Sequence, residues 1–308
     1  MADLTNPAGP DNPGDGTPRP EVRLIPPDDQ TMRVAQAPDA LVTTGLSIRT
    51  LGRFALAHGD RPIAPGEWGR RKVRDVFLYL VTKSLFDPRL PIPREELIEV
   101  FWPDLTVRTG QSSLYAAISR LRRVLEPNLG GRRQSRFIVQ DAGSYTLQLD
   151  DTDTCDAALF LRAARDALAH GHEHDLRDAL RLYGGEYLPE DRYAEWTIPA
   201  RERLTELRLA TLEALSDDRA RAGDWAAAME HAQEALRVEP SRESAHRRLM
   251  AAYAGAGQRD RALRQYRLCR VELAQAVGAE PAPETIALYY ELRELSGDAG
   301  DTDEYGAG

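Results

Sequence analysis

Residues 109–125 read Thr-Gly-Gln-Ser-Ser-Leu-Tyr-Ala-Ala-Ile-Ser-Arg-Leu-Arg-Arg-Val-Leu, and the rest of the chain is best understood from this stretch. Its apolar residues recur at offsets of four, three and four, namely Leu114, Ile118, Leu121 and Leu125. A helix that turns about 100° per residue places such residues on one stripe. The stretch therefore predicts an amphipathic helix whose apolar stripe faces a core.

The opposite face of this predicted helix is small, hydroxylated and basic, and no acid precedes Glu126. A helix that is merely solvated usually pairs Glu with Lys or Arg four residues apart. Small residues let a helix approach a duplex closely, hydroxyls bond to base edges or phosphates, and arginines oppose the phosphate charge. The pattern favours a DNA recognition helix. The alternative is an ordinary core helix with solvated arginines, so the neighbouring segments must decide.

The flanking segments predict a small sheet, two further helices and a hairpin. Leu46 to Leu56 suggest two short strands broken around Gly52, with a turn at residues 58–60. A helix is expected over 67–85, and a second over 94–102 that Pro103 ends. Two strands, 136–140 and 144–149, surround a turn at 141–143. Three helices followed by a hairpin predict a winged helix-turn-helix fold.

The first predicted helix has an unusual concentration of cations in its opening turns, where the sequence reads Arg70-Arg71-Lys72-Val73-Arg74. Cations at the amino end oppose the helix dipole, so helix stability does not explain them. Phosphate or another partner is one explanation, and solubility is the other. We predict DNA-backbone contacts for Arg71 and Lys72.

Length and composition predict a globular protein of about two domains, since the chain has 308 residues of which 42% are hydrophobic and 29% charged. No apolar run is long enough for a membrane span and no secretory signal is visible, so a cytoplasmic, nucleoid-associated protein is expected, with no membrane partner. The net charge of −9 hides an asymmetry. Residues 46–150 contain 17 Lys and Arg against 11 Asp and Glu, and the remainder contains 23 against 38. Such a basic segment suits contact with phosphate.

The second half reads as a helical repeat. Helices are expected over seven ranges: 157–170, 174–183, 194–222, 225–238, 241–256, 259–277 and 283–295. Gly223 recurs as Gly257, and Ala228 as Ala262, both displaced by 34 residues. That displacement is the period of a tetratricopeptide repeat. The expected fold class is therefore mostly α with a small β component, a winged helix followed by a tetratricopeptide-like domain. Residues 1–44 and 297–308 are expected to be a disordered leader and a flexible tail.

Several motifs now carry a family resemblance. The runs Leu51-Gly52-Arg53-Phe54, 94–104 (REELIEVFWPD), 119–125 (SRLRRVL) and 143–147 (GSYTL) resemble the OmpR-type winged helix, and more narrowly that of the Streptomyces antibiotic regulatory protein family. The resemblance implies that the third helix enters the major groove of double-stranded DNA and the hairpin touches the minor groove. It also implies tandem protomers or a homodimer on direct repeats, and contact with RNA polymerase. The residues predicted to contact DNA are Arg71, Lys72, Thr109, Ser112, Ser113, Tyr115, Ala116, Ser119, Arg120, Arg123, Arg136 and Ser144.

The second half resembles the bacterial transcriptional activation domain of the same family. The landmarks are residues 183–189 (YGGEYLP), Glu195-Trp196, Glu239-Pro240, 243–250 (ESAHRRLM) and 278–281 (GAEP). We predict a winged helix at 45–150 and an activation domain at 152–296. Many members of the family carry an ATPase module further along, and none is expected in this chain.

No motif predicts catalysis. No Gly-x-Ser-x-Gly, phosphate-binding loop or His-Glu-x-x-His occurs. His170, His172 and His174 alternate but lie in a predicted turn without a Cys, so we expect neither a metal site nor a cofactor. The sequence predicts a DNA-binding transcriptional activator that is not an enzyme. Two alternatives stay open: a protein-interaction scaffold that uses the repeat groove, and a regulator whose helical domain binds a small molecule.

Overall fold

A four-stranded sheet opens the part of the chain that the computed structural model describes, which is residues 45–127 and 134–294. Its strands are β1 (Leu46–Arg49), β2 (Ala55–His58), β3 (Arg61–Pro62) and β7 (Thr154–Cys155), in the order β3-β2-β1-β7. Alternating Leu46 and Ile48 are buried, as the sequence pattern requires. The predicted leader, the predicted tail and most of the loop at 127–134 lie outside the described residues.

The helix predicted over 67–85 is wrong at its start. A 3₁₀ turn, η1 (Pro65–Trp68), comes first, and α1 (Arg71–Ser84) follows it. Gly69 separates the two with φ of 72°, a left-handed conformation that suits glycine and interrupts a helix. Trp68 is thereby buried against the core while α1 starts in a new direction. A glycine inside an otherwise helical pattern was the available signal.

The next two helices, α2 (Arg94–Phe101) and α3 (Val107–Leu125), form the helix-turn-helix. Their close approach depends on Gly110, because a Cβ built there would lie 2.6 Å from a methyl carbon of Ile98. Thr106 caps α3, and its side-chain oxygen accepts a hydrogen bond from the backbone nitrogen of Thr109 at 3.4 Å. The predicted stripe of α3 is confirmed, since Leu114, Ile118, Leu121 and Leu125 are all buried.

The wing is the hairpin of β5 (Ile138–Asp141) and β6 (Ser144–Leu147), with β4 (Ile92–Pro93) paired to the other edge of β6. The turn has two residues rather than the three predicted, because β5 extends to Asp141. Ala142 and Gly143 have φ of 44° and 85°. Positive φ at both turn positions is the geometry that matches strand twist in a two-residue hairpin.

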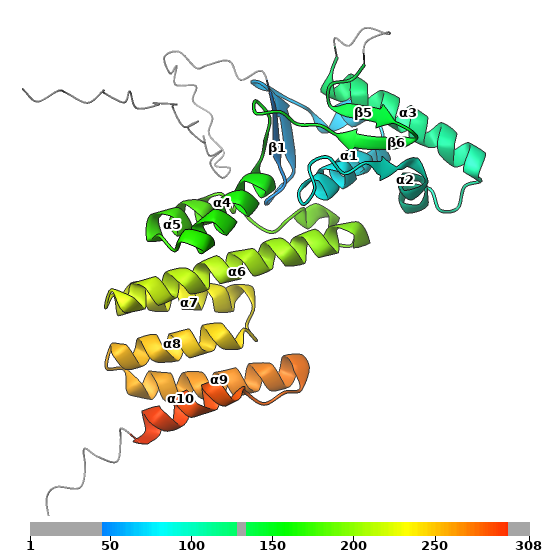
Figure 1. Cartoon of the computed structure of the whole chain (residues 1–308). Helices are drawn as coiled ribbons and strands as arrows, with labels where there is room; N and C mark the ends of the chain where they lie inside the picture. The colour runs from blue at the N-terminus through cyan, green and yellow to red at the C-terminus, as the bar shows by residue number, and fades with distance from the viewer. Residues whose placement is uncertain (1–44, 128–133, 295–308) are drawn as a thin grey trace, which may run out of the picture. The chain divides into compact units, whose positions relative to one another are not determined.

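The second half is helical, as predicted, apart from β7 and two 3₁₀ turns (Figure 1). The expected helix over 194–222 is divided into η3 (Glu195–Thr197) and α6 (Ile198–Arg221), with Pro199 in the first turn of α6. The remaining elements are α4 (Asp156–His170), α5 (Glu173–Arg181), η2 (Pro189–Asp191), α7 (Trp225–Val238), α8 (Glu243–Gly255), α9 (Arg259–Val277) and α10 (Pro283–Glu294).

The 34-residue displacement corresponds to a structural repeat. Gly223 and Gly257 end successive turns with φ of 76° and 71°. Ala228 and Ala262 are both fully buried, where α7 packs on α6 and α9 packs on α8. Each helical pair therefore uses a small residue for close contact and a glycine to close its turn.

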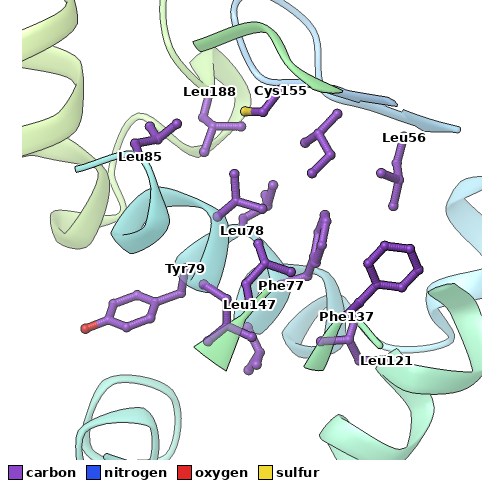
Figure 2. Packing of buried hydrophobic residues seen from close by; sticks show 14 of the residues in the cluster. Leu56, Phe77, Leu78, Tyr79, Leu85, Leu121, Phe137, Leu147, Cys155 and Leu188 are labelled. Atoms are coloured by element: carbon purple, nitrogen blue, oxygen red, sulfur yellow. The ribbon is translucent and has the colours of Figure 1, made fainter. Parts of the chain in front are cut away.

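One hydrophobic core crosses the predicted boundary at residue 150. It contains side chains from the first sheet, α1, α3 and the wing, and also Cys155, Tyr187 and Leu188 from the second half (Figure 2). The hydroxyls of Thr82 and Tyr187 lie 2.7 Å apart within it. Asp156 accepts hydrogen bonds from the backbone nitrogens of Thr50 and Leu51 at 2.8 and 2.9 Å. The winged helix and the first helices of the second half thus pack as one body.

Candidate nucleic-acid interface

The outward face of α3 is the surface that the sequence predicted for DNA. Six side chains on it are exposed, at spacings of four, three, one, three and four: Arg108, Ser112, Tyr115, Ala116, Ser119 and Arg123. Thr109 is also exposed, in the first turn. Glu126, the nearest acid along this helix, is half-buried and turns away, accepting from the backbone nitrogen of Arg136 at 2.9 Å. The face is basic and hydroxylated, without a carboxylate of its own.

Apart from Tyr115, the polar groups of this face make only local contacts. The hydroxyl of Ser112 donates to the carbonyl oxygen of Arg108 at 3.1 Å, and Arg123 Nε donates to the carbonyl oxygen of Ser119 at 3.4 Å. No hydrogen bond or ion pair joins the Arg108 side chain to any residue in 45–127 or 134–294. Guanidinium groups that are exposed and unpaired remain free to bind an external anion.

A second group of residues lies between α3 and the wing. Arg94 begins α2, and its backbone nitrogen donates to the carbonyl oxygen of Gly143 in the wing turn at 3.1 Å. Hydrogen bonds to Glu95 first, and then to Tyr115, raise the pKa of Arg94 above its ordinary value. Tyr115, 46% exposed, therefore connects the recognition face to the wing through a cation. The sequence analysis did not single out Arg94, whose role depends on the tertiary fold.

Arg120 does not point away from the core as predicted. Its side chain is half-buried and donates to the carbonyl oxygen of Glu67 in η1 at 2.6 Å. It packs beside Gly69, where a Cβ would lie 3.5 Å from Arg120 Nε. The prediction was wrong about the orientation of Arg120, because the spacing of residues within one helix carries no information about η1, which covers this flank of α3.

The cations at the start of α1 are also engaged inside the molecule. Arg71 and Arg74 both bind the buried carboxylate of Asp191 in η2, with Arg71 at 3.2 Å. Lys72 donates to the carbonyl oxygen of Phe101 and lies 5.4 Å from the centre of the Trp102 ring. The explanation for these cations is an intramolecular partner. Both side chains nevertheless remain exposed, that of Arg71 to 73%, so DNA contact by Arg71 and Lys72 stays a prediction.

The remaining predicted residues lie at the margins. Arg136 stands at the base of the hairpin, away from its turn, where it pairs with Asp150 at 2.9 Å and with Asp153. The Arg136 side chain is still 42% exposed, so its contact with the DNA backbone stays a prediction. Ser144, at the turn end of β6, and Ser113, on the flank of α3, are half-buried.

Arg108 is the residue of this face that the sequence analysis missed. We started the helix at Thr109, whereas α3 begins at Val107. Thr106 could have indicated the true start of the helix, because threonine is a frequent amino-terminal cap that accepts a hydrogen bond from a backbone nitrogen in the first turn.

The chain is similar to known transcriptional regulators. Residues 155–293 match the model of the bacterial transcriptional activator domain. The chain is 31% identical to the regulatory protein AfsR of Streptomyces coelicolor over 197 residues, which are 61% of this chain and 19% of AfsR. It is 25% identical to the transcriptional regulatory protein MoaR1 of Mycobacterium tuberculosis over 212 residues, 66% of this chain and 68% of MoaR1.

The chain carries a bacterial transcriptional activator domain at residues 155–293 and is similar to transcriptional regulators of the Streptomyces antibiotic regulatory protein family. Another such regulator, EmbR of Mycobacterium tuberculosis, is 26% identical over 261 residues, which cover 82% of this chain and 64% of EmbR. The chain therefore spans about two thirds of these mycobacterial relatives and a much smaller share of AfsR.

A solved structure supports the fold of this chain. The structure of Mycobacterium tuberculosis EmbR in complex with a low affinity phosphopeptide superposes with a TM-score of 0.68 at 24% identity, covering 81% of this chain and 65% of EmbR. Both are a winged helix followed by a helical repeat-like domain. Within the described residues, no helix has the length and apolar character that a membrane crossing requires.

Proposed function

We propose that this protein is a sequence-specific DNA-binding transcriptional activator that inserts α3 into the major groove. The similarity to transcriptional regulators and the winged helix support this proposal, since winged helices of this type place their third helix in the groove. The wing turn at Ala142 and Gly143 would approach the neighbouring minor groove.

One observation carries the proposal, namely the outward face of α3. It presents two arginines without intramolecular charge partners, Arg108 and Arg123, with hydroxyls and Ala116 between them. A duplex needs that combination, because arginine bonds to guanine edges or phosphates while a small residue allows the helix axis to approach. A scaffold would need no such face, so we prefer DNA binding to the scaffold alternative.

The proposal extends to the organisation of the protein. Residues 45–150 would supply DNA contacts, and residues 152–296 would supply contacts with RNA polymerase or with a second copy. Tandem copies would bind direct repeats in the promoter. The basic character of residues 46–150 beside an acidic remainder supports this division of roles.

The first test is a footprint of the full chain on its own upstream region and neighbouring promoters at two salt concentrations. We expect protected direct repeats, and an affinity that falls as salt rises because phosphate contacts release counterions. On the protected site, Arg123→Ala should weaken binding by about 1 to 3 kcal/mol.

The matched control is Arg237→Ala, which removes an exposed arginine from α7 in the helical half. It should leave affinity within about twofold, while both variants keep the melting temperature of the parent protein. Equal losses in the two variants would contradict the assignment of α3 to the groove. A loss that varies with base sequence indicates base readout, and a uniform loss indicates phosphate contact.

A further inference from the structure

Exposed aliphatic side chains gather at the junction of α2 and α3. Val100 is 37% exposed, Leu105 40% and Val107 72%. Two exposed acids, Glu99 and Asp104, alternate with them along the chain. We call these five residues the α2–α3 patch. Aliphatic side chains concentrated on a surface in this way often mark a contact with another macromolecule.

A second group follows one face of α9. Leu268 and Val271 are 53% and 49% exposed, and Arg264 and Arg267 lie beside them at helical spacing. No hydrogen bond or ion pair connects Arg264 or Arg267 with any other residue for which the structure gives a position. We call these four residues the α9 patch. It is basic where the α2–α3 patch is acidic.

The preceding repeat shows that the helical fold does not require this apolar face. Displacement by 34 residues relates Val271 to Arg237, and it relates Leu268 to Glu234. The buried positions keep their small residues across the repeat, since Ala228 and Ala262 are both fully buried. The core of the repeat is thus retained while its outer face changes from polar to basic and apolar. Packing within one copy does not explain the change.

We propose that the α9 patch of one copy binds the α2–α3 patch of a second copy. The aliphatic side chains of the two patches would cover each other, and Arg264 and Arg267 would oppose Glu99 and Asp104. A contact between two different surfaces is heterologous. Any contact between copies in the same orientation on direct repeats is of this kind, so the proposal deepens the proposed function and rests on it for its role at a promoter.

The size of the patches sets the expected strength. Five residues on one side and four on the other are far fewer than the 20 to 30 residues per partner, roughly, of a stable interface. Free copies should therefore associate weakly. Adjacent DNA sites would raise the effective concentration of one copy near the other and turn a weak contact into cooperative binding.

The test uses sedimentation velocity on the full chain without DNA, from micromolar to submillimolar concentration at low salt. The parent protein should show concentration-dependent self-association. Leu268→Glu/Val271→Glu, which places acids on the α9 patch, should stay monomeric. Leu105→Lys/Val107→Lys, which places bases on the α2–α3 patch, should also stay monomeric. The control Tyr193→Glu, at a side chain 91% exposed and outside both patches, should associate like the parent.

Mixing the two double variants is the decisive step, because each keeps one intact patch that complements the other. An equimolar mixture should associate, although neither double variant associates alone. A parent protein that stays monomeric, a mixture that stays monomeric, or a double variant that associates like the parent would each overturn the proposal. All variants must keep the parent melting temperature.

Failure of this proposal is separable from failure of DNA binding. Leu268→Glu/Val271→Glu should leave affinity for a DNA fragment with one protected site unchanged, while cooperativity on a two-site fragment falls by about tenfold. Unchanged cooperativity would overturn the role of the contact on DNA. Loss of DNA binding in Arg123→Ala would leave self-association as it is in the parent.

Discussion

The amino end of α1 and the outward face of α3 are both rich in arginine, yet their guanidinium groups contact different things. Arg71 and Arg74 meet the buried carboxylate of Asp191, which comes from η2 more than 110 residues later in the chain. Arg108 and Arg123 meet nothing beyond their own helix in the described part of the protein. Their sequences alone suggested the same partner, phosphate, for both.

The difference shows that local cation density does not identify a nucleic-acid surface. The relevant property is a cation that has no carboxylate partner and no partner outside its own helix after folding. A buried carboxylate needs compensation, because an unpaired charge inside a protein is costly. Asp191 therefore holds two of the arginines that the start of α1 offers. Four predictions test this comparison, in order of decreasing expected effect.

Removal of the acid from the α1 cluster should have the largest effect. Asp191→Ala removes a buried carboxylate that binds Arg71 and Arg74, leaves Arg74 with Asp75 and the more distant Glu190, and should lower the free energy of unfolding by about 2 kcal/mol. Urea denaturation followed by circular dichroism measures it. The exposed neighbour is the control, since Glu190→Ala should change stability by less than about 0.5 kcal/mol. Similar small effects in both variants would show that the cluster is not structural.

Cations of the two regions should differ in their effect on DNA affinity. Arg108→Ala should weaken binding by about tenfold or more, because it removes a free guanidinium from the groove face. Lys72→Ala should leave affinity within about twofold, because its ammonium group is already held by Phe101 and Trp102. Fluorescence anisotropy on the footprinted site measures both. A larger loss in Lys72→Ala than in Arg108→Ala would reverse the comparison.

Arg120 should behave as a structural residue within the recognition helix. Arg120→Ala removes a charged donor from the carbonyl oxygen of Glu67 and should lower the free energy of unfolding by about 1 to 2 kcal/mol. The melting temperature should fall by a few degrees, whereas that of Arg123→Ala should not change. Calorimetry of the two variants decides it. An unchanged melting temperature in Arg120→Ala would indicate an exposed side chain, as the prediction of DNA contact assumed.

The smallest expected effect is a pH dependence that comes from the helical half. Burial lowers the pKa of His246, whose Nε2 donates to the carbonyl oxygen of Pro240 at 2.8 Å while Nδ1 accepts from Gln265. The unfolded chain therefore binds a proton near pH 6.5 that the folded protein resists. This contribution to stability is complete above that pH and is lost as pH falls through it.

The measurement is urea denaturation at pH 7.5 and 5.5 for the parent protein and for His246→Gln. The parent should lose more stability than the variant on acidification. His231, whose pKa is also lowered by burial, stays in both proteins and contributes equally. Identical losses would exclude a titrating His246.

Much of the fold was predictable because its signals are local. The burial of Leu114, Ile118, Leu121 and Leu125 follows from their spacing, and the bounds of α7 and α9 agree with the predicted ranges. The repeat was visible as two residue pairs 34 positions apart. The helix break at Gly69 and the helix cap at Thr106 also depend on local residue preferences, so the sequence could have predicted them.

The free or engaged state of a basic side chain could not be predicted in this way. For Arg71, Arg120 and Arg136 the partner comes from another element, respectively η2, η1 and the segment after the wing. The extension of one hydrophobic core across the boundary at residue 150 could not be predicted for the same reason. Cys155 and Leu188 have no local pattern that marks them as neighbours of α1.

The sequence by itself determined most of the elements, the helical repeat, the core stripe of α3 and the family resemblance, since these depend on periodicity and on short motifs. Only the tertiary structure decided which arginines remain free to meet an external anion. The physical reason is that charge pairing depends on distance in space. Residues far apart in the chain, such as Arg71 and Asp191, become partners only after the two halves have packed on one core.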